Sequence, residues 1–421
     1  MKNSKKIYHV EDKLPFKLLL PLSIQHTFAM FGASVLVPIL FKINPGIVLF
    51  MNGIGTLLFI LITKKKAPAY LGSSFAFLAP GTAIIASQGF QYAQGAFIVV
   101  GIFGCILAYI IYKFGTGWID VLLPPAAMGA VVALIGFELA GNTVTGGTIG
   151  ANLMTDTASS KDFLEFFITL FTAIIGSVAF KGFFSTIPIL ISIVVGYVAA
   201  VFFGMVDFTP VREASLFTLP DFRAPRFSAS AILAMLPVIL VITSEHISHQ
   251  VVTSNIIGRD LLKEPGLHRS IFADNFSSAL SGFVGGVPTT TYGENIGVMA
   301  ITGVYSVQVI GGAAVISIIM AFFGPLAAII QTIPGNVIGG VTFLLYGMIG
   351  TSGIRLLVDQ KVDYSKSSNL VLTSVIFIAG LSGLSLKFGA IQLQGMVLAS
   401  VVAVVLSAFM TLLRKLNLIN Q

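Results

Sequence analysis

Long apolar stretches alternate with short polar connections along the whole chain. Most of them approach the roughly 20 apolar residues that a helix needs to cross a bilayer. A polar, proline-containing connection at 207–227 separates seven stretches from seven more. The stretches are 18–41, 46–62, 70–87, 94–113, 121–141, 162–181, 186–206, 229–252, 268–284, 288–302, 305–328, 336–356, 369–384 and 390–413. The pattern predicts an all-α polytopic membrane protein with fourteen transmembrane segments.

The amino-acid composition supports the prediction of a membrane protein. Hydrophobic residues make up 56% of the 421 residues and charged residues only 10%, with a mean hydropathy of +0.95. A soluble domain carries about 25% charged residues, so most of this surface is expected to face hydrocarbon. The polar, basic stretch 1–17 precedes an apolar run without an A-x-A-like cleavage site, so we expect a retained first span.

The positions of the basic residues predict an orientation. With the N-terminus in the cytoplasm, alternate threading places 18 of the 24 Lys and Arg residues on the cytoplasmic side, where they accumulate in membrane proteins. Six fall outside: Lys42, Lys161, Arg212, Arg223, Arg226 and Lys387. We therefore expect a multi-pass protein of the cytoplasmic (inner) membrane with both termini cytoplasmic. The distribution explains the net charge of +7 without a nucleic-acid partner.

The two halves carry faint signs of an internal repeat. Two sets of seven spans, an odd number, have opposite orientations, which suggests an inverted repeat. The stretches beginning at Pro124 and Pro334 share the pattern P-x4-G-[AG]-V-x2-L at an offset of 210 residues. We therefore predict a 7+7 inverted repeat.

The third segment of each half differs from an ordinary membrane helix. Residues 70–80 and 285–295 are rich in Gly, Pro, Ser, Thr and aromatic residues, and the run TTTY is typical of a strand. Unpaired backbone at membrane depth is tolerated only when it is covered by protein or lines a cavity. Two short extended strands are thus expected in segments 3 and 10, and a binding site between them.

Ionisable residues inside predicted spans are costly and usually functional. Glu245 and His249 are four residues apart, which places them on one face of a helix. A carboxylate beside an imidazole in a partly dry cavity can exchange a proton near neutral pH. The alternative is a helix–helix hydrogen bond without a transport role. The remaining residues of this kind are His26, Glu138, His246, Asp274 and Glu294.

These remaining residues differ in what they suggest. Glu294 follows the second extended segment, where the start of a half-helix would favour its negative charge and leave its oxygens free for a ligand; the alternative is a simple capping carboxylate. His246 is expected to be a helix-contact residue and His26 a structural histidine. Glu138 is assigned no role.

Several short motifs resemble the nucleobase and ascorbate transporters, in particular the bacterial uracil permeases. The family motif [QEP]-N-x-G-x4-T-[RKG] is met by Glu294, Asn295, Gly297, Thr302 and Gly303. Beside it stand QH at 25–26, GSSFAF at 72–77, SEHISHQ at 244–250, ADN at 273–275 and TTYGEN at 290–295. The similarity covers nearly the whole chain.

The resemblance implies an architecture and a mechanism. It implies a core domain (1–120, segments 1–4, and 229–332, segments 8–11) and a gate domain (121–228, segments 5–7, and 333–421, segments 12–14). It further implies a homodimer in the lipid membrane that imports its substrate with protons by an elevator-like movement of the core. No cofactor is expected, since the proton is the coupling ion.

The resemblance also implies roles for individual residues. Glu245 and Glu294 would accept from the pyrimidine N–H groups, and the backbone amides of Phe75 and Gly293 would donate to its carbonyls. The remaining implied roles are pocket lining for Ala33, Tyr292 and Tyr346, proton coupling for His249, Glu245 and Asp274, and support for His26, Asn295 and Ser74.

Other functions stay open at this point. A xanthine or urate permease of the same family is the first alternative, although purine-transporting relatives commonly carry Gln where this chain has Glu294. An anion exchanger on the same architecture is the second, and two glutamates at the site would repel its anion. A membrane enzyme or scaffold is disfavoured, since the sequence shows no Ser-His-Asp arrangement, phosphate loop or metal-spaced His/Cys set.

Overall fold

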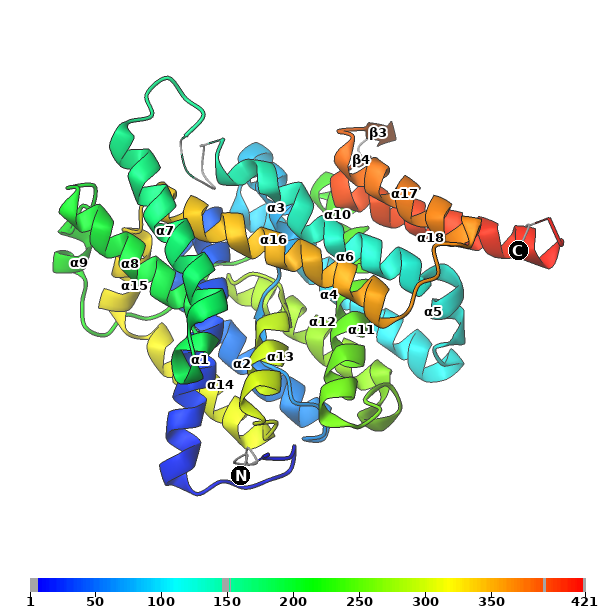
Figure 1. Cartoon of the computed structure of the whole chain (residues 1–421), viewed down its shortest axis with the longest axis horizontal. Coiled ribbons are helices and arrows are strands. Elements are labelled where there is room, and N and C mark those ends of the chain that lie inside the picture. Colours follow the sequence, from blue (N-terminus) through cyan, green and yellow to red (C-terminus); the bar gives the residue numbers. More distant parts are fainter. Residues whose placement is uncertain (1–6, 146–150, 152, 389–390, 419–421) are drawn as a thin grey trace.

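Helices make up most of the structure, a computed structural model that describes residues 7–145, 151, 153–388 and 391–418 (Figure 1). The first half contains α1 Phe16–Phe41, α2 Pro45–Ile62, β1 Leu71–Ser73, η1 Phe75–Phe77, α3 Leu78–Gln88, α4 Phe90–Phe114, α5 Gly117–Leu122, α6 Pro125–Leu139, η2 Ala140–Thr143, α7 Ser160–Ala179, η3 Gly182–Thr186, α8 Pro188–Phe202 and α9 Thr209–Glu213. The second half contains α10 Ala229–Met235, α11 Val238–Ile257, η4 Leu262–Gly266, α12 Leu267–Val284, β2 Thr289–Thr291, α13 Gly293–Thr302, α14 Val307–Ala321, α15 Gly324–Gln331, α16 Gly335–Asp359, α17 Ser367–Leu381, β3 Ser385–Phe388, β4 Ile391–Gln394 and α18 Gly395–Lys415.

Many of these helices are apolar enough for a membrane. Within the described residues, seven are also long enough to cross it: α1, α2, α4, α7, the stretch Ala229–Ile257, α16 and α18. Shorter apolar helices are Phe75–Gln88, α6, α8, α14 and α17. The prediction of a mostly helical membrane protein is confirmed, while the count of fourteen segments stays a prediction.

Several predicted segments have different boundaries in the structure. The segment 121–141 is divided before Pro124, and 229–252 is divided at Pro237, because proline lacks an amide hydrogen and restricts the residue before it. The segment 305–328 is divided between α14 and α15. The last segment does not begin as a helix at 390, since β4 pairs with β3 and α18 begins only at Gly395. This pairing of β3 with β4 was not predicted.

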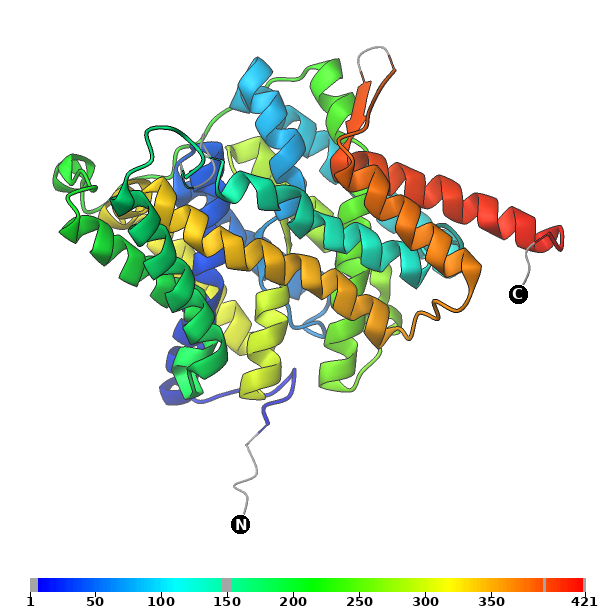
Figure 2. The same cartoon turned by 45° about the horizontal axis from the view of Figure 1, so that its top comes forward.

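The helices pack in two groups that each join distant parts of the chain. In one group α12 packs on α4 and α2, and α14 packs on α2 and α1. In the other, α16 packs on α6 and α7, and α17 and α18 pack on α6. Figure 2 shows α6 and α16 side by side, with α7 and α8 near one end and α17 and α18 near the other. The second group thus has the α6–α16 pair at its centre.

The α6–α16 crossing depends on residues without side chains. A Cβ atom added at Gly353 would lie 2.3 Å from the backbone nitrogen of Ala133 and 2.6 Å from the carbonyl oxygen of Gly129. Both neighbours are backbone atoms of α6, so they cannot turn aside. The same close approach of small residues is common where membrane helices meet.

Gly353→Val is therefore expected to destabilise the fold. Overpacking a tight core costs about 1–3 kcal/mol, and more where backbone must move. Gly347→Val is the matched control on the same helix, since a Cβ at Gly347 would meet nothing within 4 Å. Thermal denaturation of the detergent-solubilised proteins should show a lower midpoint for the first variant only. Equal midpoints for the two variants would contradict this packing.

The short sheet lies where segments 3 and 10 were expected to be extended. Strands β1 and β2 are antiparallel, with Leu71 opposite Thr291 and Ser73 opposite Thr289. All of their residues are buried. Gly72 is required in β1 because a Cβ atom would lie 2.1 Å from Cζ of Tyr292. Each strand runs into the start of a helix, η1 with α3 in one case and α13 in the other.

The chain before α1 holds the end of α13. The amide of Tyr8 donates to the carbonyl of Gly303 at 2.9 Å, and the amide of Tyr305 donates back to Tyr8 at 2.8 Å. Glu11 pairs with Arg259 beyond α11, and the guanidinium holds the pKa of the Glu11 carboxyl below its usual value. The helix that carries Glu294 is therefore fixed at both ends.

Candidate functional site

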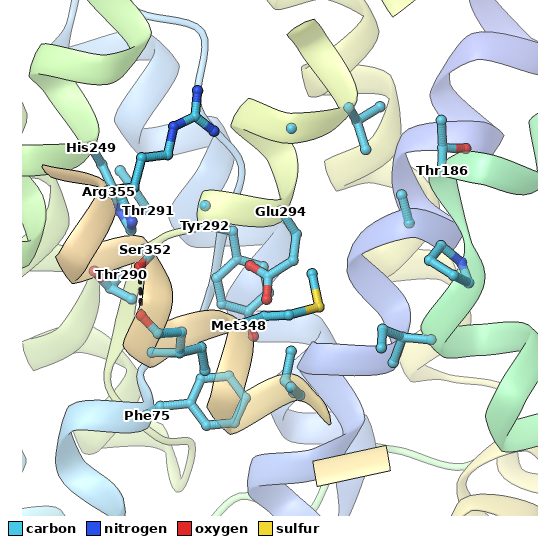
Figure 3. A pocket seen from close by; sticks show the side chains of 18 of the residues that line it. Phe75, Thr186, His249, Thr290, Thr291, Tyr292, Glu294, Met348, Ser352 and Arg355 are labelled. Atoms are coloured by element: carbon cyan, nitrogen blue, oxygen red, sulfur yellow. Dashed lines mark hydrogen bonds between the residues drawn. The ribbon is translucent and has the colours of Figure 1, made fainter. Parts of the chain in front are cut away.

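A cavity of about 330 Å³ opens between the two helix groups. One wall comes from α11, η1, β2 and α13, and the other from α16 with α6 and η3 (Figure 3). Its size falls in the usual range for small-molecule sites, roughly 300–1,000 Å³. The lining residues that bear on ligand binding are Phe75, Glu245, His249, Thr290, Thr291, Tyr292, Gly293, Glu294, Ser352 and Arg355.

Two carboxyl groups line this cavity. Glu245 comes from the middle of α11 and is only 9% exposed, and its Oε2 atom has no hydrogen-bond partner in the described part of the chain. Glu294 lies in the first turn of α13 and is a charged neighbour of Glu245. A buried polar atom without a partner costs free energy unless a ligand satisfies it. The pair therefore offers acceptors to a bound molecule.

Backbone donors stand beside these acceptors. Phe75 is the first residue of η1 and Gly293 the first residue of α13, and both line the cavity. The amides of the first turn of a helix have no partner within the helix. Because the aligned peptide dipoles also make that end positive, these amides suit a carbonyl oxygen of a ligand.

His249 lies in the same cavity but its hydrogen-bond partner was not foreseen. Its Nδ1 atom is 3.0 Å from Oγ1 of Thr291, on strand β2. Between Glu245 and His249, both within the described chain, no hydrogen bond is present. The four-residue spacing brings the two side chains into one cavity, as predicted, without joining them directly.

A second layer of buried pairs supports the lining residues. His246 Nδ1 lies 3.0 Å from Oδ2 of Asp274, and both side chains are almost fully buried. His26 Nδ1 lies 3.1 Å from Oδ1 of Asn295, which follows Glu294 on α13. His246 is thus a helix-contact residue that joins α11 to α12.

The structure brings together six of the predicted site residues and places the others behind them. Phe75, Glu245, His249, Tyr292, Gly293 and Glu294 line the cavity. Ala33, Ser74 and Tyr346 are buried but are not among the lining residues, although the Tyr346 ring packs edge-on against Phe75 with centroids 6.2 Å apart. Asp274, His26 and Asn295 form the second layer. The ligand contacts of all these residues stay predictions.

The residues of α16 that face the cavity were not predicted, although Tyr346 on the same helix was expected to line the pocket. Met348, Ser352 and Arg355 face the cavity, together with Leu345 and Ile349. Arg355 was counted among the cytoplasmic basic residues at the end of segment 336–356, but α16 continues to Asp359, whose Oδ2 lies 3.4 Å from the Arg355 Nε atom. Spacings of three, four and seven residues from Leu345 are those of one helix face, which was the available signal.

The arrangement suits a small polar molecule. Two carboxyl groups and the backbone amides at two helix starts lie in an otherwise largely apolar cavity. Among the described residues, no group of three or more His, Cys, Asp or Glu side chains could hold a metal ion. Apolar helices on all sides place the cavity inside a membrane protein. A cavity with a few convergent polar groups between two helix groups of a multi-pass membrane protein is typical of membrane transporters.

Sequence comparison identifies the family within that class. The description "Permease family" belongs to the family profile that matches residues 17–389. A protein named uracil permease from Escherichia coli strain K12 is 53% identical over 409 residues, covering 97% of this chain and 95% of the relative. Proteins of the same name are 49% identical in Paenibacillus larvae, covering 99% of both chains, and 46% identical in Bacillus subtilis, covering 91% of both. The chain belongs to this permease family, the nucleobase and ascorbate transporters; it is a permease and not an enzyme.

Solved structures share the fold with little sequence identity. The transmembrane domain of a cyanobacterium bicarbonate transporter, BicA, superposes with a TM-score of 0.64 at 16% identity, covering 95% of this chain and 100% of that one. The murine anion transporter Slc26a9 in the inward-facing state gives a TM-score of 0.70 at 10% identity, covering 96% and 69%. At such identities the likeness concerns the fold alone, since one fold hosts many functions.

Proposed function

We propose that this protein imports uracil together with protons across the cytoplasmic membrane. The observation that carries the proposal is the pair Glu245 and Glu294 facing one cavity that also holds the helix N-termini at Phe75 and Gly293. The relatives named uracil permease, at 46–53% identity over at least nine-tenths of the chain, support the choice of substrate.

The hydrogen-bonding groups of uracil are complementary to those of the site. Its ring carries two N–H donors and two carbonyl acceptors. The carboxyl groups would accept from the N–H groups, and the free amides would donate to the carbonyls. An ordinary xanthine or urate site would need further donors for the extra ring, and the carboxyl of Glu294 supplies only acceptors while it is ionised. This favours the pyrimidine over the purine.

An anion exchanger is the second candidate because the fold is shared with anion transporters. The electrostatics of the cavity argue against it. Two carboxyl groups face the space that an anion would occupy, and Arg355 is the cation that lines it in the described chain. The Arg355 side chain is 73% exposed and already contacts Asp359, so it balances the acids poorly.

Proton coupling would use the acids and imidazoles around the cavity. Glu245 presents an unpartnered carboxyl oxygen, and His249 lies within the same cavity. Asp274 pairs with His246 and interacts electrostatically with Glu245, although it is not one of the residues that line the cavity. Protonation of Glu245 when uracil binds would let the loaded site cross the membrane with one buried charge fewer, since a charge is costly at this depth, so that proton and uracil cross together.

Transport would proceed by movement of one helix group against the other. The group around α1, α2, α4, α12 and α14 would be the moving core, and the group around α6, α7, α16, α17 and α18 the gate. In the proposal the two halves are related as a 7+7 inverted repeat, the termini are cytoplasmic and the protein is a homodimer. In support, Pro124 and Pro334 both precede their helices in the same extended conformation, α6 and α16 being the helices concerned.

The proposal is tested by uptake into proteoliposomes. Purified protein is reconstituted, and uptake of radiolabelled uracil, xanthine and sulfate is measured with and without an inward proton gradient. We expect uracil uptake that the gradient stimulates and little uptake of the other two. Sulfate uptake that exceeds uracil uptake would select the anion exchanger, and preferred xanthine uptake would select the purine permease.

His249→Leu is expected to weaken the dependence of transport on protons. The substitution removes a titratable side chain from the cavity while leaving both carboxyl groups in place, so some uracil binding should remain. Initial uptake rates in proteoliposomes, measured from pH 5 to pH 8, would show a flatter profile than the wild type. A profile identical to that of the wild type would rule out a role for His249 in coupling.

A further inference from the structure

The hydrogen bond between Thr291 and His249 joins two elements that are far apart in the sequence. His249 lies on α11 and Thr291 on β2, and the Oγ1 and Nδ1 atoms are 3.0 Å apart. Both side chains line the substrate cavity, where Figure 3 shows them next to each other. The proposed steps of substrate binding and proton coupling do not use this contact.

Thr291 is a rigid anchor for this bond. Its backbone pairs with Leu71 in the sheet, and the residue is only 2% exposed. A β-branched side chain has few rotamers, so the hydroxyl is held at a fixed place. The neighbouring Thr289 hydroxyl donates instead to Oγ of Ser277, behind the strand. The strand therefore presents one fixed hydroxyl to the His249 ring.

The bond at Nδ1 decides where the other ring nitrogen points. A Cβ atom added at Gly293 would lie 3.4 Å from Nε2 of His249, so Nε2 is the nitrogen nearest the start of α13. Gly293 and Glu294 are the residues at which the ligand is expected. The partner of one imidazole nitrogen sets whether the other carries the proton.

We propose that Thr291 is a positioning residue for His249: its hydroxyl donates to Nδ1, orients the ring with Nε2 toward the substrate cavity, and so favours the tautomer with the proton on Nε2. The inference rests on the proposed role of His249 in proton coupling for its functional consequence, but the effect on the ring itself does not depend on that role.

Other charged or titratable groups lie around this ring. They are His246 on α11, Asp274 on α12, which pairs with His246, and Glu245, Glu294 and Arg355, which line the same cavity. None of them is altered by a change at Thr291. A change in the behaviour of His249 in a Thr291 variant is therefore attributable to the lost hydroxyl.

Two variants separate the hydroxyl from the shape of the side chain. Thr291→Val keeps the branched shape and removes the hydroxyl, whereas Thr291→Ser keeps the hydroxyl. In reconstituted full-length protein, we expect Thr291→Val to lower the maximal uracil uptake about tenfold, the loss expected from one hydrogen bond, and to shift its pH profile. Thr291→Ser should keep the wild-type pH profile. In a His249→Leu background, Thr291→Val should have no further effect on the profile.

A spectroscopic readout tests the positioning without transport. The ¹⁵N chemical shifts of histidine-labelled protein report the tautomer, and the His249 signals are those missing from the His249→Leu spectrum. We expect Thr291→Val to change the tautomer ratio of His249 and Thr291→Ser to preserve it. An unchanged ratio in Thr291→Val, or an equal change in both variants, would overturn the inference. A changed ratio together with a wild-type uptake profile would leave the positioning standing and refute the coupling role of His249.

Discussion

Replacing Glu245 by Ala is expected to weaken uracil binding by about one to two orders of magnitude. The side chain supplies a buried acceptor whose Oε2 has no protein partner in the described chain, so its hydrogen bond is available to the ligand. A hydrogen bond that involves a charged group contributes about 1.5–3 kcal/mol, which corresponds to a roughly 10- to 150-fold loss of affinity. Equilibrium binding of radiolabelled uracil to the purified protein measures the effect.

A control variant shows whether the loss of binding is specific to the cavity or follows from changing any acidic residue inside a span. Glu138 is a half-buried acid whose Oε2 accepts from the amide of Met396 at 2.7 Å, away from the cavity. Glu138→Gln keeps an oxygen for that amide and should retain wild-type uracil affinity. If folded Glu245→Ala protein binds uracil as well as the control does, the site has been placed wrongly.

Glu294→Gln is expected to change which nucleobase is preferred. The substitution replaces one acceptor oxygen by an amide N–H donor at the first turn of α13. An N–H group of uracil would then face another donor, whereas a ring nitrogen of a purine could accept from it. We expect the affinity for uracil relative to xanthine to fall at least about tenfold, equivalent to roughly 1.4 kcal/mol.

Competition assays measure this preference directly. Unlabelled xanthine and uracil compete with radiolabelled uracil for uptake into proteoliposomes that contain wild-type or Glu294→Gln protein. The ratio of the two inhibition constants should move toward xanthine in the variant. An unaltered preference for uracil would mean that the Glu294 carboxyl does not select pyrimidines over purines.

The composition of particular segments was sufficient to locate the two short strands and the cavity beside them. The TTTY run and the Gly- and Ser-rich stretch after Tyr70 cannot pack as ordinary membrane helices, and the structure has β2 and β1 there. Glu245 and Glu294 could be singled out because ionised side chains are rare at membrane depth. The extended segments and the two glutamates could be recognised because each depends on residues that are close together in the sequence.

Long-range contacts could not be obtained in the same way. The spacing of Glu245 and His249 placed them on one face of a helix, but it could not show that the His249 ring bonds to Thr291, 42 residues later in the chain. The pairing of His246 with Asp274 spans 28 residues. Partners so far apart depend on how helices pack, and periodicity within one helix carries no information about that.

The unpredicted hairpin has a different cause. Residues 390–413 are apolar enough for one helix, and this concealed the alternation of SLKF and IQLQ, a period of two that favours strands. Hydropathy averaged over a long window removes that period. A short window across 385–394 would have shown it.

The shared fold explains why architecture alone does not decide the substrate. BicA and Slc26a9 have the same arrangement of helices at 16% and 10% identity, and they are described as a bicarbonate transporter and an anion transporter. In this chain a pair of carboxyl groups faces the cavity, one at the start of α13 and one in the middle of α11. Substrate choice is accordingly expected to depend on a few side chains on a common scaffold.

An experimental structure with uracil bound tests the location of the site most directly. The ring should lie between Glu245 and Glu294, with its N–H groups within hydrogen-bond reach of both carboxyl groups, about 3.2 Å or less. Its carbonyls should face the amides of Phe75 and Gly293. Uracil bound elsewhere, or in contact with neither glutamate, would contradict the proposed mode of recognition.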